Sequence, residues 1–282
     1  MSLKRIASLD GRRLVRARGL WIATILFAFV LALGTTIPWA VLDDPTPSTG
    51  TAYLLGPAVD LGLPALAVIL TYASIAGLYR DGRIKVLLAP PVARHEILSG
   101  LVLARILCLW SISLIGIGVG VLTIVLFYGV PPVGPILFFT CVTLLAGASY
   151  TTIGIAVSVL VGRPIRSIAV LLVGLLFVHA IWTPLYQGVT QLILGDDSIR
   201  WVDYGILLSP TEAYSTIANG LLPASPHLDM VVAEGEVSAD AGDLVGGTIE
   251  LGELLVAVAV LVGWMVAGML VASVTIRRCE IE

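Results

Sequence analysis

The chain has 282 residues, of which 58% are hydrophobic and 12% are charged, with a net charge of −3 and a mean hydropathy of +1.01. A soluble globular domain carries about a quarter charged residues, so this composition excludes an ordinary soluble protein. Apolar runs of about 20 residues indicate instead an all-α, polytopic membrane protein.

Residues 1–19 are predicted to form a basic amphipathic helix at the membrane surface. They contain six lysines and arginines, and their apolar residues recur at helical spacing. The apolar run that follows, residues 20–40, is too long for the hydrophobic region of a signal peptide. We therefore expect an uncleaved first membrane span.

Six membrane-spanning helices are expected, within a transmembrane domain that covers residues 20–276. The apolar runs that predict them are residues 20–40, 57–79, 98–128, 136–161, 165–194 and 251–276. The acidic, turn-rich segment 43–53 is predicted to be a loop. Residues 195–250 are expected to form a long acidic exterior loop, and residues 277–282 a cytoplasmic tail.

The lysines and arginines predict how the chain is oriented in the membrane. Six precede the first span, five lie between residues 80 and 105, two are Arg163 and Arg166, and two follow the last span. The alternate loops contain one, Arg200. Both termini are therefore expected in the cytoplasm, and an even number of spans agrees with this orientation.

The exterior loop contains a predicted helix of its own. Ser209 is a suitable N-cap, Pro210 suits the first helical position, and Glu212 completes a capping box. Asn219 and Gly220 are expected to end the helix. Its apolar face predicts an interfacial or re-entrant helix at the outer leaflet.

A basic, polar segment, residues 80–105, separates the second and third apolar runs. A helix that starts at Pro91 would direct apolar side chains toward the membrane. The charged or polar residues Arg94, His95 and Glu96 would then face away from the membrane. Such a helix would be a lever on which another protein can act, whereas the plainer alternative is an ordinary positive-inside loop.

The string RIKVLLAPPVARHEILSGLVLARI resembles the signature of permease subunits of ABC-2-type transporters. The matching residues are Gly82, Leu87, Leu88, Pro91, Val92, Arg94, Glu96, Ile97, Leu98 and Gly100. The SPTEAY segment, residues 209–214, is similar to one that often follows the fifth span in that family. The chain departs from the signature at Leu101, where a basic residue is common.

The resemblance implies that the loop helix is a coupling helix, which inserts into a separate ATPase subunit. The contacting residues would be Pro91, Val92, Ala93, Arg94, His95, Glu96 and Ile97. It also implies a second permease subunit, either identical or different. Because the chain contains no GxxxxGK[ST] phosphate loop, ATP and Mg²⁺ are expected to bind to the partner. This chain itself is then expected to have no enzymatic activity and to bind no cofactor.

Two further groups of residues are candidates for function. Arg163 and Arg166 are candidates for a second contact with the ATPase, although charges that set topology explain them equally well. The candidates for a substrate path are Asp60, Tyr72, Tyr150 and His179. Asp60 and His179 are ionisable groups inside apolar runs. The plainer roles are a polar cap for Asp60 and, for His179, a hydrogen bond to a carbonyl freed by Pro184.

Small residues lie at helical spacing on two of the expected spans. They are Gly116, Gly118 and Gly120 in the third span and Ala259, Gly263 and Ala267 in the sixth. Such faces allow helices to approach closely. We expect them to pack within the chain, with a dimer interface as the alternative.

The residues predict neither a catalytic set nor a metal site, because His95, His179 and His227 fall at three different levels. The favoured function is the permease of an ATP-driven exporter in the cell membrane, with a lipophilic substrate preferred but not identified. The alternatives are an integral membrane enzyme or a secondary transporter that uses Asp60 and His179. A secondary transporter usually shows internal repeats, which the chain lacks. No nucleic-acid partner is expected.

Overall fold

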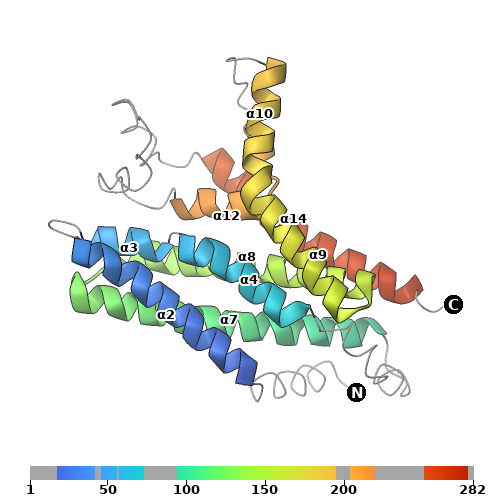
Figure 1. Cartoon of the computed structure of the whole chain (residues 1–282), viewed down its shortest axis with the longest axis horizontal. Helices are drawn as coiled ribbons and strands as arrows, with labels where there is room; N and C mark the ends of the chain where they lie inside the picture. Colours follow the sequence, from blue (N-terminus) through green and yellow to red (C-terminus); the bar gives the residue numbers. More distant parts are fainter. Residues whose placement is uncertain are drawn as a thin grey trace.

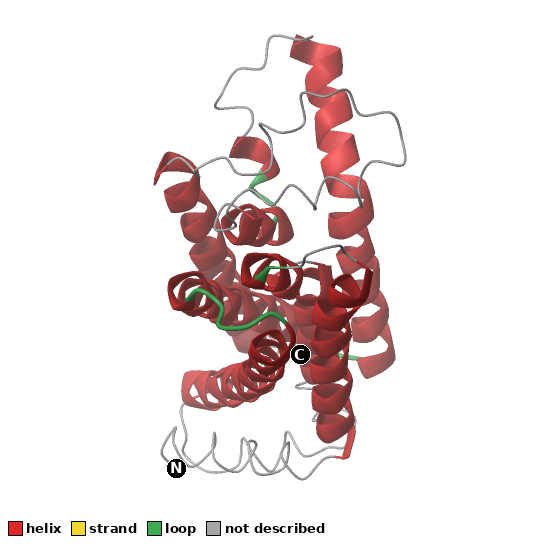
Figure 2. Cartoon of the chain, turned by 90° about the vertical axis from the view of Figure 1, so that its left-hand side faces the viewer, coloured by secondary structure: helices red, strands yellow, loops and turns green. Residues whose placement is uncertain are grey.

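A computed structural model of the chain describes residues 18–41, 46–55, 57–72, 94–194, 204–219 and 251–278. Every regular element among these residues is a helix (Figures 1 and 2), so the predicted all-α fold is confirmed for this part of the chain. Most of the predicted amphipathic helix and most of the exterior loop lie outside the described residues, so both stay predictions.

Five helical segments among the described residues are long and apolar enough to cross a membrane. Four of them belong to single helices: α2 (Arg18–Val41), α7 (Arg94–Phe127), α8 (Val133–Val161) and α14 (Leu251–Arg278). The fifth joins α9 (Pro164–Leu176), η1 (Phe177–Trp182) and α10 (Thr183–Leu194). These segments coincide with five of the six apolar runs.

The remaining expected span contains α4 (Pro57–Thr71), which has 15 residues. A helix needs about 20 residues to cross the hydrocarbon of a bilayer, so α4 alone is too short. Residues 73–79, which would complete the span, lie outside the described residues. The number of six spans therefore stays a prediction.

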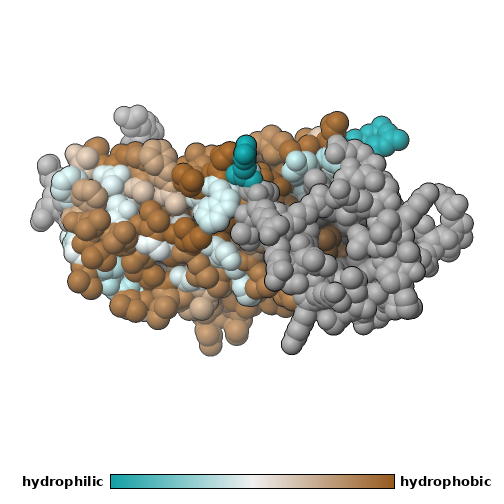
Figure 3. All heavy atoms as spheres, turned by 90° about the horizontal axis from the view of Figure 1, so that it is seen from below, coloured by the Kyte–Doolittle hydropathy of each residue, from teal (hydrophilic) through white to brown (hydrophobic). Residues whose placement is uncertain are grey.

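The exposed surface of the long helices is apolar. Ile25 on α2, Leu126 on α7 and Leu192 on α10 are 65%, 71% and 87% exposed. Hydrophobic side chains cover most of the described part of the face in Figure 3. A surface of this kind requires contact with lipid or another protein. Together with the five helices that are long enough to cross a bilayer, it indicates a multi-pass membrane protein.

The helix that contains η1 is the least buried of the five candidate spans, with 6% of its apolar window buried. Its upper part, α10, projects from the bundle (Figure 1). η1 is a π-helical turn immediately before Pro184. Proline has no N–H to bond the carbonyl of Ala180, and its ring crowds that carbonyl. The wider π turn accommodates both effects.

The predicted loop at residues 43–53 is wrong for its second half, because α3 (Pro47–Leu55) is helical. Pro47 occupies the first helical position, where its missing N–H costs nothing. The N–H of Gly50 then bonds the carbonyl of Thr46 at 3.1 Å. Leu54 anchors the helix, since it is fully buried against α7. Turn-forming residues such as Pro47 and Gly50 are therefore accommodated within the helix.

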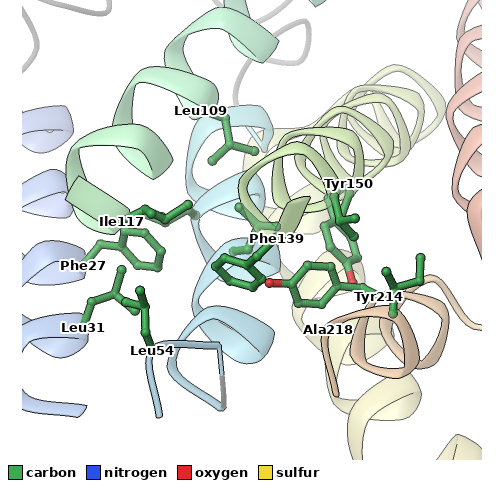
Figure 4. Close-up of a cluster of buried hydrophobic side chains, with 14 of the residues drawn as sticks. Phe27, Leu31, Leu54, Leu109, Ile117, Phe139, Tyr150, Tyr214 and Ala218 are labelled. Carbon is green, nitrogen blue, oxygen red and sulfur yellow. The ribbon is translucent and has the colours of Figure 1, made fainter. Parts of the chain in front are cut away.

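Helix α12 (Pro210–Asn219) has the bounds predicted from its capping residues. α12 packs into the bundle against α14 and α8, and its expected interfacial or re-entrant position at the outer leaflet stays a prediction. Tyr214 points from α12 toward Phe139 and Tyr150 in the main core (Figure 4). Its apolar face thus meets protein rather than lipid.

The bundle has two hydrophobic cores. The larger contains residues of α2, α3, α4, α7, α8, α12 and α14. The smaller lies where α7 begins and joins α7 to the last turns of α8 and to α14. We call the end of the bundle with the first residues of α7 the Arg94 end, and the opposite end the α12 end.

Two of the three small residues of α7, Gly116 and Gly120, pack within the chain as expected, whereas Gly118 is exposed. A Cβ atom on Gly116 would lie 2.6 Å from Phe27, and one on Gly120 would lie 2.2 Å from Leu54. The expectation is wrong for α14, where Ala259, Gly263 and Ala267 are exposed. Gly268 instead packs against the backbone of α8.

Replacing Gly268 by alanine should lower the free energy of unfolding by about 1–3 kcal/mol, the usual cost of overpacking. The new Cβ would lie 2.8 Å from the carbonyl carbon of Thr152, and backbone atoms cannot move aside as a side chain can. Gly263→Ala on the same helix is the control, since its Cβ would meet nothing within 4 Å. Thermal unfolding of both variants in detergent checks this, and equal stabilities would contradict it.

Candidate functional site

The predicted coupling residues lie at the start of α7. Arg94, His95, Glu96 and Ile97 form its first turn, whereas Pro91–Ala93 lie outside the described residues. α7 continues unbroken from these four residues to Phe127, so they share one helix with the expected third span. A helix of 34 residues is about 51 Å long. The hydrocarbon of a bilayer is about 30 Å thick, so α7 extends well beyond it.

The turn between α8 and α9 lies at the same end. Gly162 ends α8 with a φ of 65°, a conformation that favours glycine. Pro164 then occupies the first position of α9. Arg163 and Arg166 are both exposed. The structure therefore places Arg163 and Arg166 at the same end of the bundle as residues 94–97.

The smaller core fixes the start of α7 relative to this turn. Leu98 and Leu101 of α7 pack with Ile155 and Val159 of α8 and with Ala272 of α14. Leu101 is 7% exposed. Leucine suits this buried position, since a charged side chain there would lose its hydration.

A polar cluster joins α4, α7 and α8 beside this core. Arg105 of α7 is 9% exposed, and its Nη1 donates a hydrogen bond to the carbonyl oxygen of Leu70 in α4. The hydroxyl of Ser158 in α8 donates to the carbonyl oxygen of Tyr72 at 3.3 Å. By its place in the sequence, Arg105 belongs to the basic segment of residues 80–105. Its position inside an apolar run was the signal that it is buried.

A pocket of about 240 Å³ lies between α4, α8 and α9. Its walls are almost entirely apolar, with Ala67, Ile153 and Leu171 from these three helices and Trp264 from α14. Tyr150 lines the pocket and donates a hydrogen bond to the hydroxyl of Thr211 at 3.3 Å. A pocket with this lining can hold a hydrocarbon group and offers few polar atoms to an ion.

The other candidates for a substrate path are not gathered around this pocket. Tyr72 follows the end of α4 at the Arg94 end. His179 is half-buried in η1, and its side chain is not among those that line the pocket. The backbone of Asp60 lies in α4, and its side chain is outside the described set. The structure thus brings Tyr150 to the pocket and keeps Tyr72 and His179 apart from it.

Polar contacts hold the α12 end together, and the first two below were not predicted from the sequence. The hydroxyl of Thr183 in α10 donates a hydrogen bond to the carboxylate of Glu212 in α12, so this bond joins the two helices. The indole N–H of Trp264 donates to the carbonyl of Leu208 at 2.8 Å. The N–H of Glu212 bonds the Ser209 hydroxyl at 3.4 Å, so that half of the predicted capping box forms.

No cluster of residues that could ligate a metal ion occurs among the described side chains. No curated protein matches the chain in sequence comparison. The family model described as ABC-2 family transporter protein matches residues 5–278, which is nearly the whole chain. Together with the five apolar helices, this match shows that the chain belongs to the ABC-2 family of transporter membrane proteins.

Proposed function

We propose that this chain is the permease subunit of an exporter in the cell membrane, driven by ATP that a separate ATPase subunit hydrolyses. The single observation that carries the proposal is the unbroken helix α7, which begins with Arg94, His95 and Glu96 and extends beyond the bilayer. A force on this charged first turn is transmitted along a rigid helix into the membrane. ATP and Mg²⁺ would be bound by the partner, since the chain has no phosphate loop.

In this proposal the Arg94 end faces the cytoplasm, together with both termini. The positive-inside distribution of lysine and arginine supports that orientation. The ATPase would contact residues 91–97 first, and Arg163 and Arg166 would provide a second contact. The exposure of Arg163 and Arg166 at the Arg94 end of the bundle supports such a surface.

A second permease subunit is part of the proposal. The exposed apolar face of α9, η1 and α10 supports it, with Val173 at 66% and Leu176 at 64% exposure. The exposed small residues of α14, such as Gly263, would also allow close approach of another helix.

The proposed substrate is lipophilic. The pocket between α4, α8 and α9 supports this class, because its walls are apolar and it lies among membrane-spanning helices. A charged or strongly hydrated substrate would lose its hydration there without replacement contacts. Asp60 and His179 remain candidates for contacts elsewhere on the path.

Exchanging the charges of the first turn of α7 should abolish binding of the ATPase. We expect purification of the wild-type protein from its own cells, in mild detergent, to recover a nucleotide-binding ATPase. The double variant Arg94→Asp/Glu96→Arg should lose it, because like charges would then oppose at the interface. Mass spectrometry of the purified samples provides the measurement.

Arg200→Asp is the control, since that residue belongs to the predicted exterior loop. It should recover as much ATPase as the wild type. Absence of any ATPase from the wild-type sample would refute the proposed function. Full recovery with the double variant would instead place the contact elsewhere.

A further inference from the structure

The end of α4 is held by side chains from two other helices. A helix leaves its last carbonyl oxygens without partners inside the helix, and these carry its partial negative charge. α4 ends at Thr71. Arg105 of α7 donates to the carbonyl of Leu70, and Ser158 of α8 donates to that of Tyr72. Hydrogen-bond donors from α7 and α8 thus stabilise the C-terminal end of α4.

The guanidinium of Arg105 suits this position. Arginine stays protonated in proteins, and a buried charge is costly unless it is paired with polar groups. The negative end of the α4 dipole is a favourable partner for a cation. A buried arginine in an apolar helix is therefore expected to have a defined task, and the contact with Leu70 identifies α4 as its target.

α4 also fits closely against α8 at this junction. A Cβ atom on Gly154 would lie 2.1 Å from the hydroxyl oxygen of Thr71, so the glycine makes room for that side chain. Thr71 itself donates to the carbonyl of Ala67 at 2.6 Å. The end of α4 is therefore fixed by polar contacts to α7 and by close packing on α8.

This junction lies between the proposed ATPase contact and the pocket. Arg105 is 11 residues after Arg94 on one continuous helix, a distance of about 16 Å along its axis. On α4, Ala67 and Val68 line the pocket within one turn of Leu70. A movement of the first turn of α7 can therefore reach the pocket wall through the Arg105 contact, in addition to the packing of α4 and α7 in the larger core.

We propose that Arg105 is a positioning residue that makes α4 and α7 move as one unit when the partner ATPase displaces the start of α7. This inference rests on the proposed function. Without the Arg105 contact, the end of α4 and its pocket residues would follow a shift of α7 less closely. The ATPase would then bind and hydrolyse ATP, but transport would be uncoupled from hydrolysis.

The first test measures the junction without the ATPase. Spin labels are placed at Ile69 on α4 and Leu107 on α7, both about half exposed, in a variant that lacks cysteine. Pulsed electron paramagnetic resonance gives the distribution of label distances in nanodiscs. We expect a narrow distribution with Arg105, a broader one with Arg105→Met, and a narrow one again with Arg105→Lys, which keeps a cationic donor.

The second test measures coupling in the complete complex. Arg105→Met should reduce transport per ATP hydrolysed at least about tenfold, since a hydrogen bond to a charged group is worth roughly that factor or more. The amount of ATPase that co-purifies should stay unchanged, and Arg105→Lys should restore most of the transport. Arg18→Met is the control, because Arg18 is an exposed arginine at the start of α2, and it should behave as wild type in both tests.

Wild-type label distances and wild-type coupling in Arg105→Met would overturn the inference. If the methionine variant does not fold, Arg105→Leu, which also removes every hydrogen-bond donor, replaces it under the same criteria. If no ATPase accompanies the wild type, the proposed function fails. The label distances then still show whether Arg105 joins α4 to α7, so the two failures are distinguishable.

Discussion

Replacing Tyr214 by alanine should destabilise the folded protein by about 3 kcal/mol, the lower end of the range for truncating a buried aromatic side chain. Tyr214 is 1% exposed and lies in the main core. Its ring centroid is 6.3 Å from that of Phe139, and its hydroxyl lies 3.2 Å from that of Thr143. Because lipid is as apolar as the core, lost packing contacts rather than transfer to water account for the cost.

Thermal unfolding of the purified protein measures this effect. Tyr214→Phe keeps the ring and removes the hydroxyl, so it should cost about 1 kcal/mol, the value of one hydrogen bond. Phe138→Ala is the matched control, since Phe138 precedes Phe139 on α8 but is 36% exposed. It should cost less than Tyr214→Ala. A stability of Tyr214→Ala equal to that of the Phe138 control would show that α12 does not belong to the core.

The bounds of α12 were predictable because its signals are local. Ser209, Pro210 and Glu212 act within one turn, and Asn219 ends the helix. The position of α12 was not predictable, because it depends on residues far away in the chain. Tyr214 enters the core through contacts with Phe139 and Thr143. The sequence pattern of an apolar helix face is the same whether that face contacts lipid or protein.

The same distinction applies to the spans. Long apolar runs predict α2, α7, α8 and α14, because composition and length determine whether a helix can cross a bilayer. The π turn before Pro184 and the helical segment after Thr46 depend on how the backbone accommodates a proline. Such accommodation is decided by neighbouring helices as well as by the local sequence.

The candidate site was predictable in part. The charged triplet at Arg94 is recognisable from its spacing, but its continuity with α7 is a property of the folded chain. Tyr150 lines the pocket, whereas nothing in the sequence distinguishes it from Tyr72. The positive-inside rule counts lysines and arginines by their place in the sequence, so it does not distinguish the buried Arg105 from exposed loop residues. The contact of Arg105 with Leu70 joins residues 35 positions apart, which no local pattern encodes.

Replacing Val157 by tryptophan should reduce transport of a lipophilic substrate at least about tenfold, since changes of a few methylene groups in an apolar pocket alter selectivity by factors of 10–200. Val157 is on α8 and lines the pocket of about 240 Å³ between α4, α8 and α9. An indole at this position would occupy much of the pocket. Because it enters existing space, it should not push the helices apart, so the thermal stability should change little.

Leu160→Trp is the matched control, because Leu160 is on the same helix, is 58% exposed and does not line the pocket. It places an indole on the outer face of α8, where lipid accommodates it. Transport of a fluorescent lipid analogue and co-purification of the ATPase should be measured for both variants. Loss of transport in Val157→Trp alone, with the ATPase retained, would identify the pocket as part of the substrate path. Equal transport in the two variants would exclude the pocket from that path, while leaving the ATPase contact at the Arg94 end unaffected, because the two sites lie on different parts of the bundle.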